Sequence, residues 1–121
     1  MNKTYLACIA HDGKKSSMVH LAMSHKKVFD KYKIVATGTT GKFLEKAGLE
    51  VLQMQSGPVG GDAEIANMIV HGEVFAVIFL VDPLDVHPHQ VDVSMLLRLC
   101  NVHNVPVATN EAMAEILLKT L

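Results

Sequence analysis

Polar side chains and glycines collect in four short clusters, each of which follows an apolar run typical of a buried strand. In chain order the clusters read HDGKK (11–15), TGTTG (37–41), SGPVGGD (56–62) and DPLDVHPHQVD (82–92). They supply carboxylates, imidazoles, hydroxyls, lysines and glycines, which are groups suited to proton transfer and to holding a phosphate. If the strands run parallel, all four clusters lie at the edge of the sheet where such folds bind ligands. We therefore expect one site assembled from distant segments.

The segment 37–41 places two glycines and three hydroxyls where a strand passes into a helix. Backbone N–H groups and the positive end of the helix dipole would face outward there, which is typical of a phosphate site. Lys15 could add a positive charge. The sequence has neither a Walker A loop nor a G-x-G-x-x-G motif, so the usual nucleotide signals are missing. The alternative is an ordinary tight turn in which Thr40 caps the helix and Lys15 is solvated.

The segment 56–62 ends on Asp62, at the expected start of a helix. Its three glycines would allow the backbone to approach a ligand closely. Asp62 could serve as a general base, or it could simply cap the helix. The sequence alone leaves both roles open.

The segment 82–92 holds three carboxylates and two histidines within eleven residues. His87 and His89, with Asp85 or Asp92, could ligate a metal, although the proline between the histidines constrains their geometry. Alternatively, His89 could polarise a carbonyl or carry a proton while Asp92 or Asp82 orients it. A third possibility is a solvated loop in which Asp92 caps the next helix.

The pattern between these clusters predicts strands that alternate with helices. We expect strands at 4–10, 33–37, 50–54, 75–81 and 106–109. We expect helices at 16–29, 40–47, 62–71, 92–101 and 110–119. The first and fourth strands are apolar throughout, as in strands covered on both faces. The fold class is therefore α/β: a single three-layer domain over residues 1–121, with a mostly parallel five-stranded sheet and helices on both faces.

Composition excludes several classes of protein. With 121 residues, 50% of them hydrophobic, the chain can form one compact core, which excludes a disordered protein. Its longest apolar run, residues 74–81, is too short to span a membrane, and no signal peptide is apparent. A net charge of −1 and a single arginine argue against a nucleic-acid partner. Cys8 and Cys100 lie in unrelated elements, which indicates reduced core thiols in a cytoplasmic protein. The remaining histidines, at 20, 25, 71 and 103, are interpreted as surface residues of helices.

Five motifs in order resemble the methylglyoxal synthase family over nearly the whole chain. They are HD (11–12), ATGTTG (36–41), QSGPVGGD (55–62), FLVDPLDVHPHQVD (79–92) and VPVATN (105–110). The resemblance implies an enzyme that converts dihydroxyacetone phosphate into methylglyoxal and inorganic phosphate, with no metal or organic cofactor. It also implies a cytoplasmic homohexamer that phosphate inhibits.

The resemblance also implies residue roles. Asp62 matches the base, and His89 matches the histidine beside the carbonyl or enediolate oxygen of the substrate. Asp12, Asp82 and Asp92 match the aspartates that support the proton network. The matches on the substrate-binding side are His11, Lys15, Thr37, Gly38, Thr39, Thr40, Ser56, Gly57 and again His89. Asp85 and His87 occupy positions that the family pattern leaves open, which weakens the metal hypothesis.

The resemblance stops short at the C-terminus. Family members continue past the last helix into a segment whose arginine reaches a neighbouring subunit's active site, whereas this chain ends at Leu121. Arg98 matches a different family position and is not taken as its replacement, so the inter-subunit link and the cooperativity that depends on it stay open. Two other functions remain open: a non-catalytic regulatory domain that binds phosphate on the same fold, and an isomerase or aldolase acting on the same triose phosphate.

Overall fold

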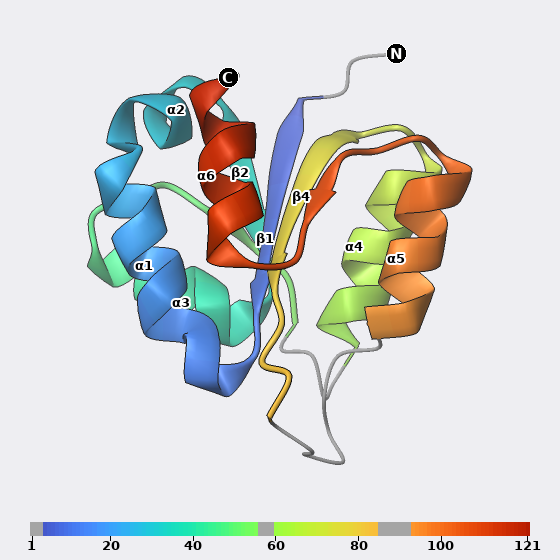
Figure 1. The fold of residues 1–121 in the computed structure, drawn as a ribbon, viewed down its shortest axis with the longest axis horizontal. Helices are drawn as coiled ribbons and strands as arrows, with labels where there is room; N and C mark the ends of the chain where they lie inside the picture. The colour runs from blue at the N-terminus through green and yellow to red at the C-terminus, as the bar shows by residue number, and fades with distance from the viewer. Residues whose placement is uncertain (1–3, 56–59, 85–92) are drawn as a thin grey trace.

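The computed structural model describes residues 4–55, 60–84 and 93–121. Five strands form one sheet in the order β3-β2-β1-β4-β5, and every neighbouring pair is parallel (Figure 1). The strands are β1 (Tyr5–Ala10), β2 (Lys33–Ala36), β3 (Leu52–Gln53), β4 (Val74–Leu80) and β5 (Val107–Ala108). The helices are a short 3-10 helix η1 (Asp12–Lys14), α1 (Lys15–Ser24), α2 (Lys26–Lys31), α3 (Gly38–Lys46), α4 (Gly61–Val70), α5 (Val93–Val102) and α6 (Glu111–Lys119). The predicted α/β fold with a parallel sheet is confirmed.

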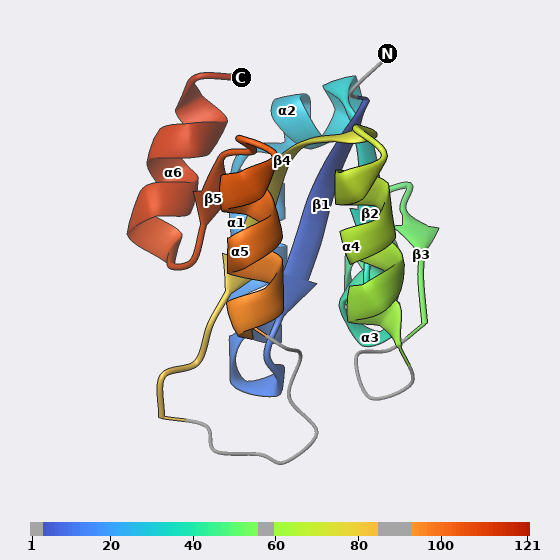
Figure 2. The ribbon, with the colours of Figure 1, turned by 90° about the vertical axis from the view of Figure 1, so that its right-hand side faces the viewer.

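Helices cover both faces of the sheet and give it two separate apolar layers. Helices α1, α2, α3 and α6 lie on one face, and α4 and α5 lie on the other (Figures 1 and 2). Alternate residues of β1 enter the two layers: Leu6 and Cys8 join the first, Ala7 and Ile9 the second. Strand β4 divides in the same way, which explains why both central strands are apolar at almost every position.

The predicted helix over 16–29 is interrupted at His25, so it forms α1 and α2 instead. The Nε2–H of His25 donates to the carboxylate of Glu115 in α6 at 2.8 Å, and the His25 side chain is only 14% exposed. The interpretation of His25 as a surface residue is therefore wrong, because this contact draws its ring between helices that are distant in the sequence. His20 and His71 are exposed, as predicted.

Helices α3 and α4 begin earlier than predicted, and this excludes Thr40 and Asp62 as their N-cap residues. Thr37 is the N-cap of α3, so Thr40 lies inside its first turn. Gly60 is the N-cap of α4, and its φ of 101° lies in the left-handed region that favours glycine. Asp62 is consequently the second residue of α4 rather than its cap.

Both cysteines are buried and free, as predicted. Burial raises the pKa of the Cys8 thiol to about 12 and also raises the pKa of Cys100. None of the helices within the described ranges is long and apolar enough to cross a membrane.

Candidate functional site

The strand order reverses direction between β1 and β4, and one predicted site residue lies shortly after the end of each of these strands. His11 comes after β1 and Asp82 lies two positions beyond the end of β4. The backbone N–H of His11 donates to the carbonyl of Leu80 at 3.2 Å, and the N–H of Asp82 donates to Nδ1 of His11 at 2.9 Å. The two segments therefore meet at the point of an open parallel sheet where ligands bind.

His11 is buried, with 5% of its surface exposed, and one edge of its ring remains unused. Because Nδ1 accepts the Asp82 N–H, the ring proton must sit on Nε2. Nε2 is itself buried and has no hydrogen-bond partner among the described residues. The ring stands edge-on to Phe79, with 5.4 Å between centroids, which fixes its orientation. His11 can thus donate a hydrogen bond to an oxygen of a bound molecule.

The two oxygens of the Asp82 carboxylate have different surroundings. Oδ1 accepts the N–H of Leu84 at 3.0 Å, which closes a short turn after β4. Oδ2 lies over Gly13, where a Cβ atom would come within 2.5 Å of it. Gly13 therefore makes room for this carboxylate, a role that sequence reasoning missed although the glycine stands inside the HDGKK cluster.

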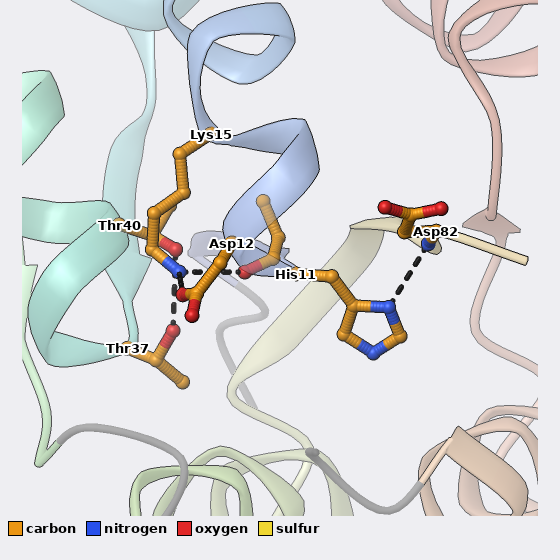
Figure 3. Close-up of polar contacts among 7 residues, drawn as sticks. His11, Asp12, Lys15, Thr37, Thr40 and Asp82 are labelled. Carbon is orange, nitrogen blue, oxygen red and sulfur yellow. Dashed lines mark hydrogen bonds and ion pairs between the residues drawn. The ribbon is translucent and has the colours of Figure 1, made fainter. Parts of the chain in front are cut away.

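Lys15 is the first residue of α1, and its ammonium is drawn into the site. Nζ donates to the carbonyl of Ala10 at 3.1 Å and to the carboxylate of Asp12 at 2.7 Å. The Lys15 side chain is 10% exposed and that of Asp12 is 88% exposed, so the solvated alternative for Lys15 is wrong. An ammonium has three donors, so one N–H has no acceptor among the residues that the structure describes and can donate to an anion. In Figure 3 the Lys15 side chain extends from α1 toward the part of the chain that carries Thr37 and Thr40.

The start of α3 offers hydroxyl and backbone donors beside that ammonium. Thr37 and Thr40 are buried, and their hydroxyl oxygens lie 3.5 Å apart. The N–H of Gly38 is already taken by the carbonyl of Gln55 at 3.1 Å. The first N–H groups of a helix have no intrahelical acceptor, and within the described ranges those of Thr39 and Thr40 are not bonded to another backbone carbonyl, so they can donate to an anion. We call residues 37–40 together with Lys15 the phosphate cradle, after the ligand that the sequence predicts for them.

Asp62 and Glu64 both lie in the first turn of α4. The carboxylate of Asp62 accepts the N–H of Ala63 at 2.9 Å. The carboxylate of Glu64 accepts the N–H of Gln55 at 2.8 Å, which ties α4 to the segment after β3. Sequence reasoning missed this tie, because nothing in the local pattern connects Glu64 to a residue nine positions away.

Several predicted site residues lie outside the described residues. They are Ser56, Gly57, His89 and Asp92, together with the alternative metal ligands Asp85 and His87. Within the described ranges, no group of three or more histidine, cysteine or acidic side chains is arranged to hold a metal.

A cavity of about 690 Å³ opens at the opposite, amino edge of the sheet. Its lining includes Tyr5, Lys31, Lys33 and Glu50, and none of the predicted site residues contributes to it. The cavity and the predicted site are therefore separate features.

Comparisons with known proteins agree with the geometry. The family model described as "MGS-like domain" matches residues 17–109. A methylglyoxal synthase from Caldicellulosiruptor saccharolyticus is 50% identical over 117 residues, covering 96% of this chain and 83% of that protein. One from Bacillus mycoides is 51% identical over 117 residues, covering 96% of this chain and 89% of that protein. The crystal structure of methylglyoxal synthase from Elizabethkingia anophelis superposes with a TM-score of 0.92 at 40% identity, covering 96% of this chain and 77% of that one.

Proposed function

The chain belongs to the methylglyoxal synthase family of carbon–oxygen lyases, and on this basis we propose that it converts dihydroxyacetone phosphate into methylglyoxal and inorganic phosphate. The observation that best supports this substrate is the meeting of two groups at one sheet edge. A buried lysine ammonium lies at the same edge as the buried hydroxyls of Thr37 and Thr40. A buried imidazole, whose Nε2 has no hydrogen-bond partner in the described part of the chain, stands at the end of the neighbouring segment (Figure 3).

In this proposal the phosphate cradle binds the phosphate end of the substrate. The remaining N–H of Lys15 and the N–H groups of Thr39 and Thr40 donate to phosphate oxygens. The hydroxyls of Thr37 and Thr40 complete the described part of the cradle, and Gly38 supports it through its bond to Gln55. Ser56 and Gly57 are proposed to add donors from the neighbouring segment.

The ketone end of the substrate is proposed to lie near Asp62 and the two histidines. Asp62 removes a proton from the carbon next to the ketone, and the resulting enediolate needs a donor at its oxygen. We assign that donor to His89, with the Nε2–H of His11 as a further contact to a substrate oxygen. Asp12, Asp82 and Asp92 support the proton network, and Asp12 and Asp82 also hold Lys15 and His11 in place.

Loss of phosphate, rather than return of the proton, distinguishes this reaction from an isomerisation. The C–O bond to phosphate must align with the π system of the enediolate before it can break. A cradle built from buried groups on two helices would hold that torsion, which supports a synthase over an isomerase or an aldolase. No metal or organic cofactor is needed in this scheme.

We further propose that the protein acts as a homohexamer in the cytoplasm and that inorganic phosphate inhibits it. Phosphate would compete for the cradle because it carries the same charged oxygens as the substrate. Light scattering of the purified protein measures the assembly, and initial rates at increasing phosphate concentration measure the inhibition.

The decisive experiment incubates the purified protein with dihydroxyacetone phosphate and a metal chelator, and quantifies methylglyoxal and phosphate together. Equal release of both products, lost in Asp62→Asn, would support a metal-independent synthase with Asp62 as its base. General-base loss typically lowers turnover by about 10²- to 10⁴-fold. Formation of glyceraldehyde 3-phosphate would indicate an isomerase instead. No product, with phosphate still bound, would indicate the non-catalytic regulatory domain.

A further inference from the structure

Glu64 makes a hydrogen bond to a residue at each end of the connection between β3 and α4. Its side chain accepts the N–H of Gln55 at 2.8 Å, while its own backbone N–H donates to the carbonyl of Gly60 at 3.1 Å. Gln55 and Gly60 flank residues 56–59. The side chain of Glu64 therefore ties Gln55, at one end of this connection, to the first turn of α4, which begins at the other end.

The same connection continues to the phosphate cradle. The carbonyl of Gln55 accepts the N–H of Gly38, the first residue of α3, at 3.1 Å. One position earlier, the N–H of Met54 donates to the carbonyl of Ala36 at 2.8 Å. The backbone of Gln55 is thus bonded on one side to the helix that carries Asp62 and on the other to the helix that carries Thr39 and Thr40.

We propose that Glu64 is a positioning residue, which fixes the turn carrying Asp62 relative to the phosphate cradle. This inference rests on the proposed function, in which Asp62 acts on one end of a substrate whose phosphate is held at the start of α3. Both ends must be placed at once, because a displacement of about 1 Å can cost about 100-fold in rate. Glu64 touches neither end of the substrate and acts only through the backbone of Gln55.

A simpler role for Glu64 is electrostatic. A negative charge in the first turn of a helix interacts favourably with the positive end of the helix dipole and stabilises the helix, and Glu64 is an exposed carboxylate in that position. The two roles need different properties of the side chain. The dipole effect needs negative charge, whereas the bond to Gln55 needs only an oxygen acceptor at the same reach. Glutamine keeps the acceptor and loses the charge, so Glu64→Gln separates the two roles.

The experiment compares Glu64→Gln and Glu64→Ala with the parent, and uses Glu111→Ala as the matched control. Glu111 is an exposed first-turn carboxylate of α6. In Glu64→Ala we expect kcat with dihydroxyacetone phosphate to fall about tenfold or more, with a smaller change in inhibition by inorganic phosphate, which occupies the cradle alone. Glu64→Gln and Glu111→Ala should stay within about twofold of the parent. If Glu64→Gln fell as far as Glu64→Ala, or if Glu64→Ala kept its turnover, the positioning role would be wrong.

Amide hydrogen exchange tests the same tie without turnover. The amides of Gln55 and Gly38 should exchange faster in Glu64→Ala than in Glu64→Gln, while amides in the middle of β1 should not change. Equal exchange in the two variants would overturn the inference. If the parent released no methylglyoxal, the proposed function would fail, yet the exchange of these two amides would still decide whether Glu64 holds them.

Discussion

The backbone N–H of Asp82 donates to Nδ1 of His11 across 71 positions of sequence, at 2.9 Å. This bond sets the histidine tautomer, because a nitrogen that accepts a hydrogen bond cannot carry the ring proton. It also leaves Nε2–H as the only donor of the ring, in a buried position. The chemistry of His11 is thus decided by a strand that lies next to β1 in space and far from it in the chain.

Replacing His11 with asparagine or glutamine separates two roles of its ring: accepting the Asp82 N–H at Nδ1, and donating from Nε2–H to a bound molecule. In His11→Asn the side-chain oxygen can replace Nδ1 as the acceptor for Asp82, but no donor reaches the Nε2 position. We expect stability close to that of the parent and turnover lowered by about 10²-fold or more. In His11→Gln the longer amide can place a donor near the Nε2 position, so turnover should fall less. Steady-state rates and urea unfolding of both variants check this, and equal rates in the two would argue against a donor role.

Removal of the Lys15 ammonium should weaken phosphate binding more than it weakens folding. A hydrogen bond to a charged group contributes about 1.5–3 kcal/mol, so Lys15→Met should raise KM and the inhibition constant of phosphate by about 10- to 100-fold. Lys42→Met is the control, because Lys42 is an exposed lysine of α3. Initial rates across substrate and phosphate concentrations measure both constants. An unchanged phosphate constant in Lys15→Met would remove Lys15 from the cradle.

Gly60 and Gly48 allow backbone strain to be compared at two positions. Both have positive φ, at 101° and 93°, and a Cβ at either would meet nothing within 4 Å. Alanine at either position should therefore cost about 1–2 kcal/mol of stability through the left-handed backbone alone. Only Gly60 precedes the turn that carries Asp62, so Gly60→Ala should also lower kcat several-fold. Urea unfolding and steady-state kinetics test both variants. Equal kcat values for Gly60→Ala and Gly48→Ala would show that the change of backbone at Gly60 does not affect the turn that carries Asp62.

Cys8 should be unreactive in the folded protein. Its pKa is raised from 9.0 to about 12 by burial, so the native thiol stays protonated where the unfolded thiol ionises. Between about pH 9 and 12 the unfolded chain therefore binds fewer protons, and stability should fall by up to about 1.4 kcal/mol per pH unit from this group. A thiol reagent should label Cys8 only after unfolding. In Cys8→Ala, the free energy of unfolding should fall less steeply with rising pH, by this amount. An identical slope in the variant and the parent would contradict the raised pKa of Cys8 as the cause.

Much of the fold follows from local properties of the sequence. Runs such as residues 74–81 are apolar on both faces, and only a strand between two helical layers satisfies that pattern. Because parallel strands end at the same edge, the sequence also predicts that all four polar clusters meet there. The described parts of the first, second and fourth clusters, including His11, Lys15 and Thr37, do lie at one edge.

The details that shape the site were decided by tertiary structure. The strand order places β4 beside β1, and this pairing, rather than any motif, brings Asp82 to His11. His25, at the break between α1 and α2, contacts Glu115 of α6, and α4 starts after Gly60, whose backbone is left-handed. Local periodicity determines which residues are buried and which elements form, because it acts over neighbouring residues. Strand order, long-range hydrogen bonds and the exact starts of helices depend on partners distant in the chain, so only the folded structure decides them.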